Sequence, residues 1–167
     1  MTAGAEAQIA FGHRTGAIGR IVELHATFYA RQAGFGLLFE AKVARELAEF
    51  TSRLGQDRNG LWLAMSDGAI IGSIALDGGD PDGHTAHLRW FILDENRRGA
   101  GVGRQLLAAA LAFADERDFP ETHLWTFQSL HAARRLYEAA GFALGEERPG
   151  AQWGEMVVEQ RYVRRRP

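Results

Sequence analysis

A glycine-rich turn between residues 91 and 104 carries the strongest chemical signal in this chain of 167 residues. Apolar residues up to Leu93 predict a strand, and the apolar periodicity from Val102 onward predicts a helix directly after the turn. Between them, Gly99, Gly101 and Gly103 let the backbone approach a ligand without Cβ atoms in the way. The helix adds unpaired amides and the positive end of its dipole. These features together predict an anion site, most naturally one for a pyrophosphate.

Two common nucleotide-binding patterns do not fit this turn. A dinucleotide fingerprint that starts at Gly99 would need its third glycine where Arg104 stands. A phosphate loop of the nucleotide-hydrolase type would need Gly-Lys-Ser or Gly-Lys-Thr, whereas this chain has Gly103-Arg104-Gln105. The competing interpretation without a ligand is a tight connection between strand and helix.

Two segments resemble the hallmarks of the GNAT N-acyltransferases. The turn is similar to their acyl-CoA-binding signature, with Arg98-x-x-Gly101-x-Gly103. The segment 133–142 is similar to their later helix, which carries A-x-x-x-Y and ends in Gly-Phe, here with Tyr137. One predicted strand separates the two segments, as in that family. The resemblance extends over nearly the whole chain.

Periodicity and turn signals agree with the fold that this resemblance implies. An apolar stripe at helical spacing predicts an amphipathic helix over 37–54, and Asp67-Gly68 predicts a hairpin turn. We expect one GNAT domain over 1–167, of mixed α/β (α+β) class, with helices on both faces of a mostly antiparallel sheet of about seven strands. The expected order is β-α-α-β-β-β-α-β-α-β-β. The expected strands cover 8–13, 61–65, 70–76, 84–93, 123–128, 142–147 and 155–163, and the expected helices cover 16–32, 37–54, 102–117 and the segment around Tyr137.

Composition excludes several classes of chemistry. The chain has no cysteine, which excludes disulfides, thiolate metal sites and a cysteine nucleophile. Its formal net charge of −2 provides no overall basic field for nucleic acid or a membrane surface. No apolar run reaches membrane-spanning length. We therefore expect a cytoplasmic protein without nucleic-acid or membrane partners, with Arg164–Pro167 as a solvated tail.

The resemblance also implies how a coenzyme would be bound. It implies acetyl-CoA as co-substrate and no metal, with the backbone of 91–93 pairing with pantetheine and the amides of 98–104 holding the pyrophosphate. An amide of 91–93 could also stabilise the oxyanion. The candidate coenzyme-binding residues are Phe91, Ile92, Leu93, Arg98, Gly99, Ala100, Gly101, Val102, Gly103, Arg104, Gln128 and Ala133.

Tyr137 is the candidate general acid that the resemblance implies. A free phenol titrates near 10 and a thiol near 8.5, so at neutral pH the tyrosine remains protonated and can donate to the thiolate leaving group. One departure concerns the position seven residues earlier, where many family members carry an asparagine and this chain carries Leu130. Gln128 and Ser129 are the candidate substitutes for that asparagine.

The general base is the second departure, because the glutamate that some members carry on the strand before the turn is missing. His87 is the first candidate, since its neutral form is available near pH 7. Strand alternation places His87 on one face with Arg89 and Phe91, and Arg89 would lower its pKa. A partly buried structural histidine is the competing interpretation. Glu155 is a further candidate for the acceptor pocket, or else a surface carboxylate.

The function predicted is transfer of an acetyl group from acetyl-CoA to a primary amine, by direct attack in a ternary complex. The acceptor is a small molecule or a peptide or protein amine, and the alternative is a non-catalytic acyl-CoA-binding module of the same fold. Aromatic side chains in the first two helices and the final hairpin favour an amphipathic acceptor. The candidates for its pocket are His25, Tyr29, Phe35, Phe39, Trp62, Trp90, Trp125 and Trp153.

The chain also resembles one subgroup, the acetyltransferase half of bacterial proteins that fuse a MarR-type DNA-binding domain to a GNAT domain. This likeness implies a bacterial source. In the superfamily the final hairpin commonly supports dimers, which implies a homodimer. The acceptor, the preferred acyl chain and the general base stay open at this point.

Overall fold

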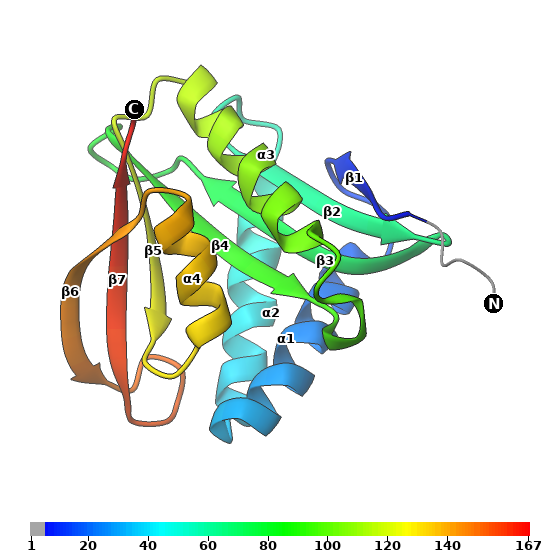
Figure 1. Cartoon of the computed structure of the whole chain (residues 1–167). Coiled ribbons are helices and arrows are strands. Elements are labelled where there is room, and N and C mark those ends of the chain that lie inside the picture. Colours follow the sequence, from blue (N-terminus) through cyan, green and yellow to red (C-terminus); the bar gives the residue numbers. More distant parts are fainter. Residues whose placement is uncertain (1–5) are drawn as a thin grey trace.

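Within residues 6–167, which the computed structural model describes, seven strands form one sheet in the order β1-β2-β3-β4-β5-β7-β6 (Figure 1). Neighbouring strands are antiparallel except β4 and β5, which run parallel. The predicted mixed, mostly antiparallel sheet is therefore confirmed. The strands are β1 (Gln8–Phe11), β2 (Gly60–Ser66), β3 (Ala69–Asp77), β4 (Thr85–Leu93), β5 (Glu121–Phe127), β6 (Ala143–Gly150) and β7 (Val157–Arg165).

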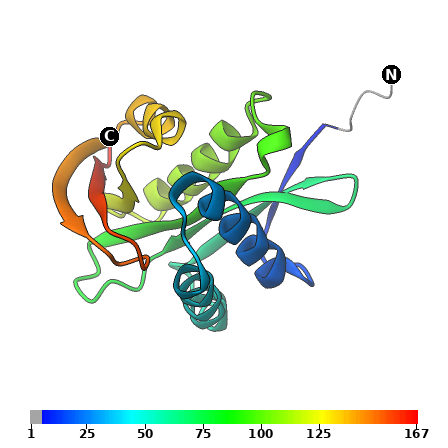
Figure 2. The same ribbon diagram turned by 90° about the horizontal axis from the view of Figure 1, so that it is seen from below.

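Helices cover both faces of this sheet. α1 (Ala17–Ala33) and α2 (Leu37–Ser52) lie on one face, and α3 (Val102–Glu116) and α4 (His131–Ala139) lie on the other (Figure 2). The apolar stripe that predicts α2 is the stripe that this helix buries. None of the helices within residues 6–167 is long and apolar enough to cross a membrane.

The predicted order of helices and strands is confirmed, and the differences mostly concern their ends. α2 ends at Ser52, β5 begins at Glu121, and a short 3-10 helix at Glu95–Arg97 was not predicted. The prediction of a solvated tail is wrong for Arg164. This residue belongs to β7 and is buried, and its guanidinium donates two hydrogen bonds of 2.9 Å to Asp115 of α3.

The parallel strands β4 and β5 stay paired over only a short distance. Their register joins Thr85 to Glu121, and it ends with His87 opposite His123. Past that pair the two strands separate, and the backbone edges of Leu88–Leu93 and Leu124–Phe127 face a gap (Figure 1). Backbone amides and carbonyls at such an edge require partners from outside the sheet.

A bulge in β4 changes which face its side chains occupy. Ser73 pairs with Ile92 and Ala75 pairs with Arg89, so two residues of β4 oppose one residue of β3. Trp90 adopts a left-handed backbone with φ of 48°, which is strained for a bulky side chain. The Ser73 hydroxyl donates a hydrogen bond of 2.7 Å to the Trp90 carbonyl and so holds the bulge in place.

This bulge corrects one prediction about strand alternation. Arg89 and Trp90 both lie on the face covered by α2, where the guanidinium stands 4.1 Å from the centre of the Trp90 ring. Phe91 packs on the opposite face, beneath α3 and α4. His87 therefore shares a face with Arg89, as predicted, but not with Phe91.

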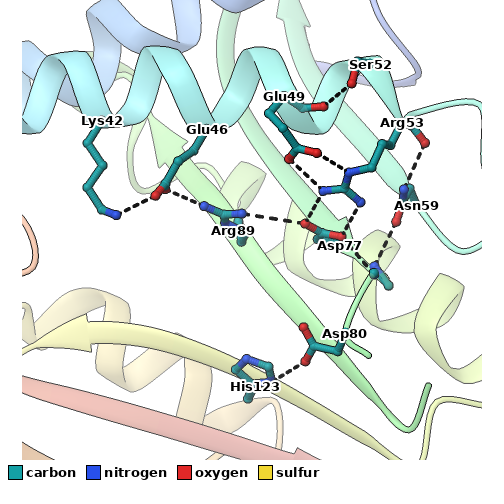
Figure 3. A network of polar contacts seen from close by, with 12 residues as sticks. Lys42, Glu46, Glu49, Ser52, Arg53, Asn59, Asp77, Asp80, Arg89 and His123 are labelled. Carbon is teal, nitrogen blue, oxygen red and sulfur yellow. Dashed lines mark hydrogen bonds and ion pairs between the residues drawn. The ribbon is translucent and has the colours of Figure 1, made fainter. Parts of the chain in front are cut away.

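A chain of alternating charges ties α2 to the sheet (Figure 3). Both oxygens of Asp77 accept hydrogen bonds from Arg53, at 3.0 and 2.9 Å, and Glu49 binds the same guanidinium. Asp77 is buried at the end of β3. Burial alone would raise the pKa of Asp77, but the hydrogen bonds from Arg53 and from the Gly79 amide outweigh it, so its pKa lies below the ordinary value.

We expect Asp77→Asn to lower the free energy of unfolding at neutral pH by about 2 kcal/mol, because it removes the charge from a buried bidentate pair. A carboxyl whose pKa is lower in the folded chain stabilises the fold fully above its unfolded pKa, near 3.9, and loses this effect as the pH falls through the folded value. The difference in the free energy of unfolding between wild type and variant, measured by urea unfolding, should therefore shrink as the pH falls. The exposed Asp67→Asn serves as the control and should show no such difference.

Candidate active site

A cavity of about 1290 Å³ occupies the gap between β4 and β5. Its walls come from α1, α2, α3 and α4, from β4 and β5, and from the loop between β6 and β7. One end lies at the start of α3 and the other end beside α2. The site thus lies where the sheet itself leaves backbone groups without strand partners.

The start of α3 forms the first end of the cavity. Gly99 and Gly101 have φ values of 88° and 79°, a left-handed backbone that glycine adopts without strain. The Gln105 amide donates the first hydrogen bond of the helix, to the Gly101 carbonyl at 3.1 Å, so the amides just before it precede the helical ladder. No acidic side chain stands in the first turn of α3 in the described chain. This end has the amides and the dipole direction that an anion requires.

Most of the predicted anion-site residues line this end. Arg98, Gly99, Gly101, Val102, Gly103 and Arg104 are in the lining, whereas Ala100 lies outside it. The Arg98 guanidinium stands 4.6 Å from the centre of the Phe28 ring of α1. The turn before α3 is held from α1 by Arg20, which pairs with Asp94 at 3.4 Å, and by Arg31, which pairs with Glu95.

Tyr137 of α4 lines the middle of the cavity and is itself buried. Its ring packs against Phe91 of β4, with ring centres 6.0 Å apart, and against Phe142 and Tyr162. Burial, together with the nearby Tyr29, raises the pKa of Tyr137 far above its ordinary value. The phenol is therefore protonated at neutral pH, as the sequence argument requires of a proton donor.

Of the other predicted coenzyme-binding residues, all but one line the cavity. Phe91, Ile92, Leu93 and Ala133 line the cavity, but Gln128 does not. The backbone N–H of Gln128 donates a hydrogen bond of 2.9 Å to the Val158 carbonyl of β7. Its neighbours Ser129 and Leu130 are in the lining, so of the two candidate substitutes for the family's asparagine, Ser129 is the one that faces the cavity.

His87 lies where β4 and β5 part, and its ring stacks on His123 with 4.6 Å between ring centres. Burial lowers the pKa of His87 to about 3, with further contributions from the positive charge of Arg89 and from His123. His87 is thus neutral near pH 7, as predicted. In the part of the chain that the structure describes, no group of three His, Asp or Glu side chains is placed to hold a metal ion.

Aromatic rings and three charged side chains form the end beside α2. Among the predicted aromatic candidates, His25, Tyr29, Phe35, Phe39, Trp90, Trp125 and Trp153 line the cavity, and Trp62 instead packs in the core with Phe11 and Phe113. Burial raises the pKa of Tyr29 to about 12. Glu155 lies outside the lining. Lys42 and Glu46, which the sequence analysis missed, line it together with Arg89.

Comparison with known proteins supports the same family. Residues 20–142 match the model of the acetyltransferase (GNAT) family. N-acetylaspartate synthetase of Xenopus tropicalis is 33% identical over 81 residues, which cover 48% of this chain and 30% of that protein. N-acetyltransferase 8 of Rattus norvegicus is 32% identical over 101 residues, which cover 58% of this chain and 46% of that protein. The chain therefore spans less than half the length of these two relatives.

Solved structures at low sequence identity share the fold. A proposed acetyltransferase of Salmonella typhimurium, yncA, solved with its cofactor acetyl-CoA, matches with a TM-score of 0.78 at 16% identity, covering 96% of this chain and 94% of that one. An acetyltransferase of the GNAT family from Staphylococcus aureus Mu50 gives a TM-score of 0.73 at 18% identity, covering 97% of this chain and 100% of that one. At these identities the likeness concerns the fold, and it agrees with the predicted one.

We expect the imidazole of His87 to stay neutral between about pH 5 and 8, because its pKa is lowered to about 3. Its NMR chemical shifts should be flat over this range, with the resonance assigned by comparison with His87→Gln. A titration midpoint near the ordinary value of about 6.5 would show that the ring is solvated and that its environment differs from the one described.

Proposed function

The chain belongs to the acetyltransferase (GNAT) family, and on this premise we propose that it transfers the acetyl group of acetyl-CoA to a primary amine. One observation carries the proposal. The free amides at the start of α3 and the buried phenol of Tyr137 open into the same cavity. An anion cradle and a protonated acid are the two groups that a thioester substrate with a diphosphate handle needs.

We propose the following arrangement of acetyl-CoA in the cavity. The amides of Val102, Gly103 and Arg104 hold the pyrophosphate, and the Arg98 and Arg104 side chains add positive charge. The pantetheine arm forms backbone hydrogen bonds with the open edge of β4 along residues 91–93, where β4 is no longer paired with β5. The acetyl group then lies between the parted strands, close to Tyr137.

Transfer proceeds by direct attack of a neutral amine on the thioester carbonyl. The carbonyl oxygen gains negative charge, which a backbone amide in 91–93 stabilises. As the carbon–sulfur bond breaks, the Tyr137 hydroxyl donates its proton to the sulfur, and CoA leaves as the thiol. The amine loses its extra proton to solvent, and the Tyr137 phenolate takes a proton back from solvent, so the enzyme ends in its starting state. His87, with a pKa near 3, is too weak a base to retain that proton at neutral pH, so we assign it no proton-transfer role.

The alternative is an acyl-CoA-binding module of the same fold without turnover. Leu130, which stands where many family members carry an asparagine, favours this alternative. A homodimer through the final hairpin and a kinship with MarR–GNAT fusion proteins stay predictions of the sequence resemblance, and a cytoplasmic location stays a prediction of the composition.

Replacing Tyr137 by Phe tests the chemical step. We expect kcat to fall roughly a hundredfold or more, because the sulfur loses its proton donor, with little change in CoA affinity. Release of free thiol from acetyl-CoA with a panel of amines measures turnover, and calorimetry measures CoA binding. Tyr162→Phe is the matched control, because that hydroxyl is buried beside Tyr137 and lies outside the cavity lining. CoA binding without turnover on any amine would favour the binding module.

A pair of substitutions at Gly103 tests the anion cradle. A Cβ at this position would meet its nearest neighbours, on Leu136 and Phe91, at 3.6 Å, which is ordinary contact. We expect Gly103→Asp to weaken CoA binding roughly tenfold more than the equally large Gly103→Asn, because only the former brings negative charge to the pyrophosphate. The unfolding temperature of Gly103→Asp should be no lower than that of Gly103→Asn, since a carboxylate favours a helix start. Equal CoA affinities for the two variants would contradict the cradle.

A further inference from the structure

Three charged side chains meet at the end of the cavity beside α2 (Figure 3). The Lys42 ammonium lies 2.5 Å from one oxygen of Glu46, and Arg89 of β4 lies 2.6 Å from the other oxygen. Both oxygens of Glu46 are thus already bound to cations. Lys42 and Arg89 keep further N–H donors, because an ammonium has three and a guanidinium five.

Arg89 also contacts one carboxylate that lies outside the cavity lining. Asp77 stands 3.7 Å from Arg89, but both of its oxygens accept from Arg53, and it lies outside the cavity lining. Among the described residues that line the cavity, Glu46 is the one acidic side chain. The lining groups at this end therefore carry two positive charges and one negative charge.

Aromatic rings surround the space between these charges and the middle of the cavity. Tyr29, Phe35 and Phe39 contact one another with ring centres 5.1–6.0 Å apart. Phe127 and Trp153 continue this wall, with ring centres 5.6 Å apart. Such a wall binds a flat or bulky apolar body.

From this juxtaposition we propose that the acceptor is an amino carboxylate with an apolar or aromatic body, whose carboxylate binds Arg89 and Lys42. Arg89 is the specificity-determining residue, because a guanidinium matches a carboxylate in a two-pronged geometry. The amine of the acceptor then points toward the middle of the cavity. This inference rests on the proposed function for the reaction, but it concerns binding and can be tested without turnover.

Three probes separate the carboxylate from the rest of the acceptor. L-Phenylalanine, L-phenylalanine amide and 2-phenylethylamine share the ring and the amine, and only the first carries a carboxylate. Trp90, Trp125 and Trp153 line the cavity, so tryptophan fluorescence of the protein, with and without CoA, reports binding. We expect phenylalanine to bind roughly ten- to a hundredfold more tightly than the other two. Equal affinities, or no binding of phenylalanine, would overturn the proposal.

Variants assign this preference to its residues. Arg89→Gln and Lys42→Met should each remove most of the advantage of phenylalanine over 2-phenylethylamine and leave the affinity for the latter nearly unchanged. Arg45→Gln is the matched control, since it removes an exposed guanidinium of α2 from outside the cavity. If Arg89 had only a structural role, Arg89→Gln would weaken the binding of both probes alike, and that result would also overturn the proposal.

Thiol release, measured in the same samples, tests the reaction separately. Selective binding of phenylalanine without thiol release from acetyl-CoA contradicts the proposed acetyl transfer and supports the proposed binding preference. If thiol release with 2-phenylethylamine and with phenylalanine amide is at least as fast as with phenylalanine, the result supports the proposed acetyl transfer and contradicts the proposed preference for a carboxylate.

Discussion

The separation of β4 from β5 beyond the His87–His123 pair is the constraint on which the site depends. A sheet that ends its ladder in mid-strand leaves amides and carbonyls that must find other partners, and burying them without partners is costly. The surrounding helices do not fill the gap, and the cavity lies there instead. A ligand with its own amide groups, such as the pantetheine arm of a coenzyme, is suited to complete the ladder.

The bulge at Trp90 lets one strand serve both ends of this cavity. Before the bulge, Arg89 is directed toward α2 and the charged end, and after it Phe91 is directed toward Tyr137 and α4. Regular alternation would have placed Arg89 and Phe91 on the same face. The strained backbone of Trp90 is stabilised by its ring, which packs against Phe50 of α2, and by the hydrogen bond from Ser73 to its carbonyl.

Much of the fold could be predicted from local signals in the sequence. The order of the elements and the glycine turn followed from periodicity and spacing, because these features are decided within short segments. The placement of Tyr137 followed from the resemblance of residues 133–142 to a GNAT helix. The bulge could not be predicted, since neither glycine nor proline marks Trp90. The grouping of Lys42, Glu46 and Arg89 joins a helix to a strand far along the chain, and no local pattern encodes that contact. The burial of Arg164 likewise depends on Asp115, a partner on another element.

The bulge also decides which face of the sheet the later side chains of β4 occupy, whatever those side chains are. Straightening the bulge while keeping all of its residues would restore regular pleating and turn every later side chain of the strand to the opposite face. Phe91 would then lie on the face of Arg89, and Ile92, which now packs against Leu24 and Phe28 of α1, would turn away from them. Diverging descendants of this chain can therefore exchange many side chains along the strand, whereas loss of the bulge with all residues kept would separate Phe91 from Tyr137 while Arg89 stayed on the face of α2.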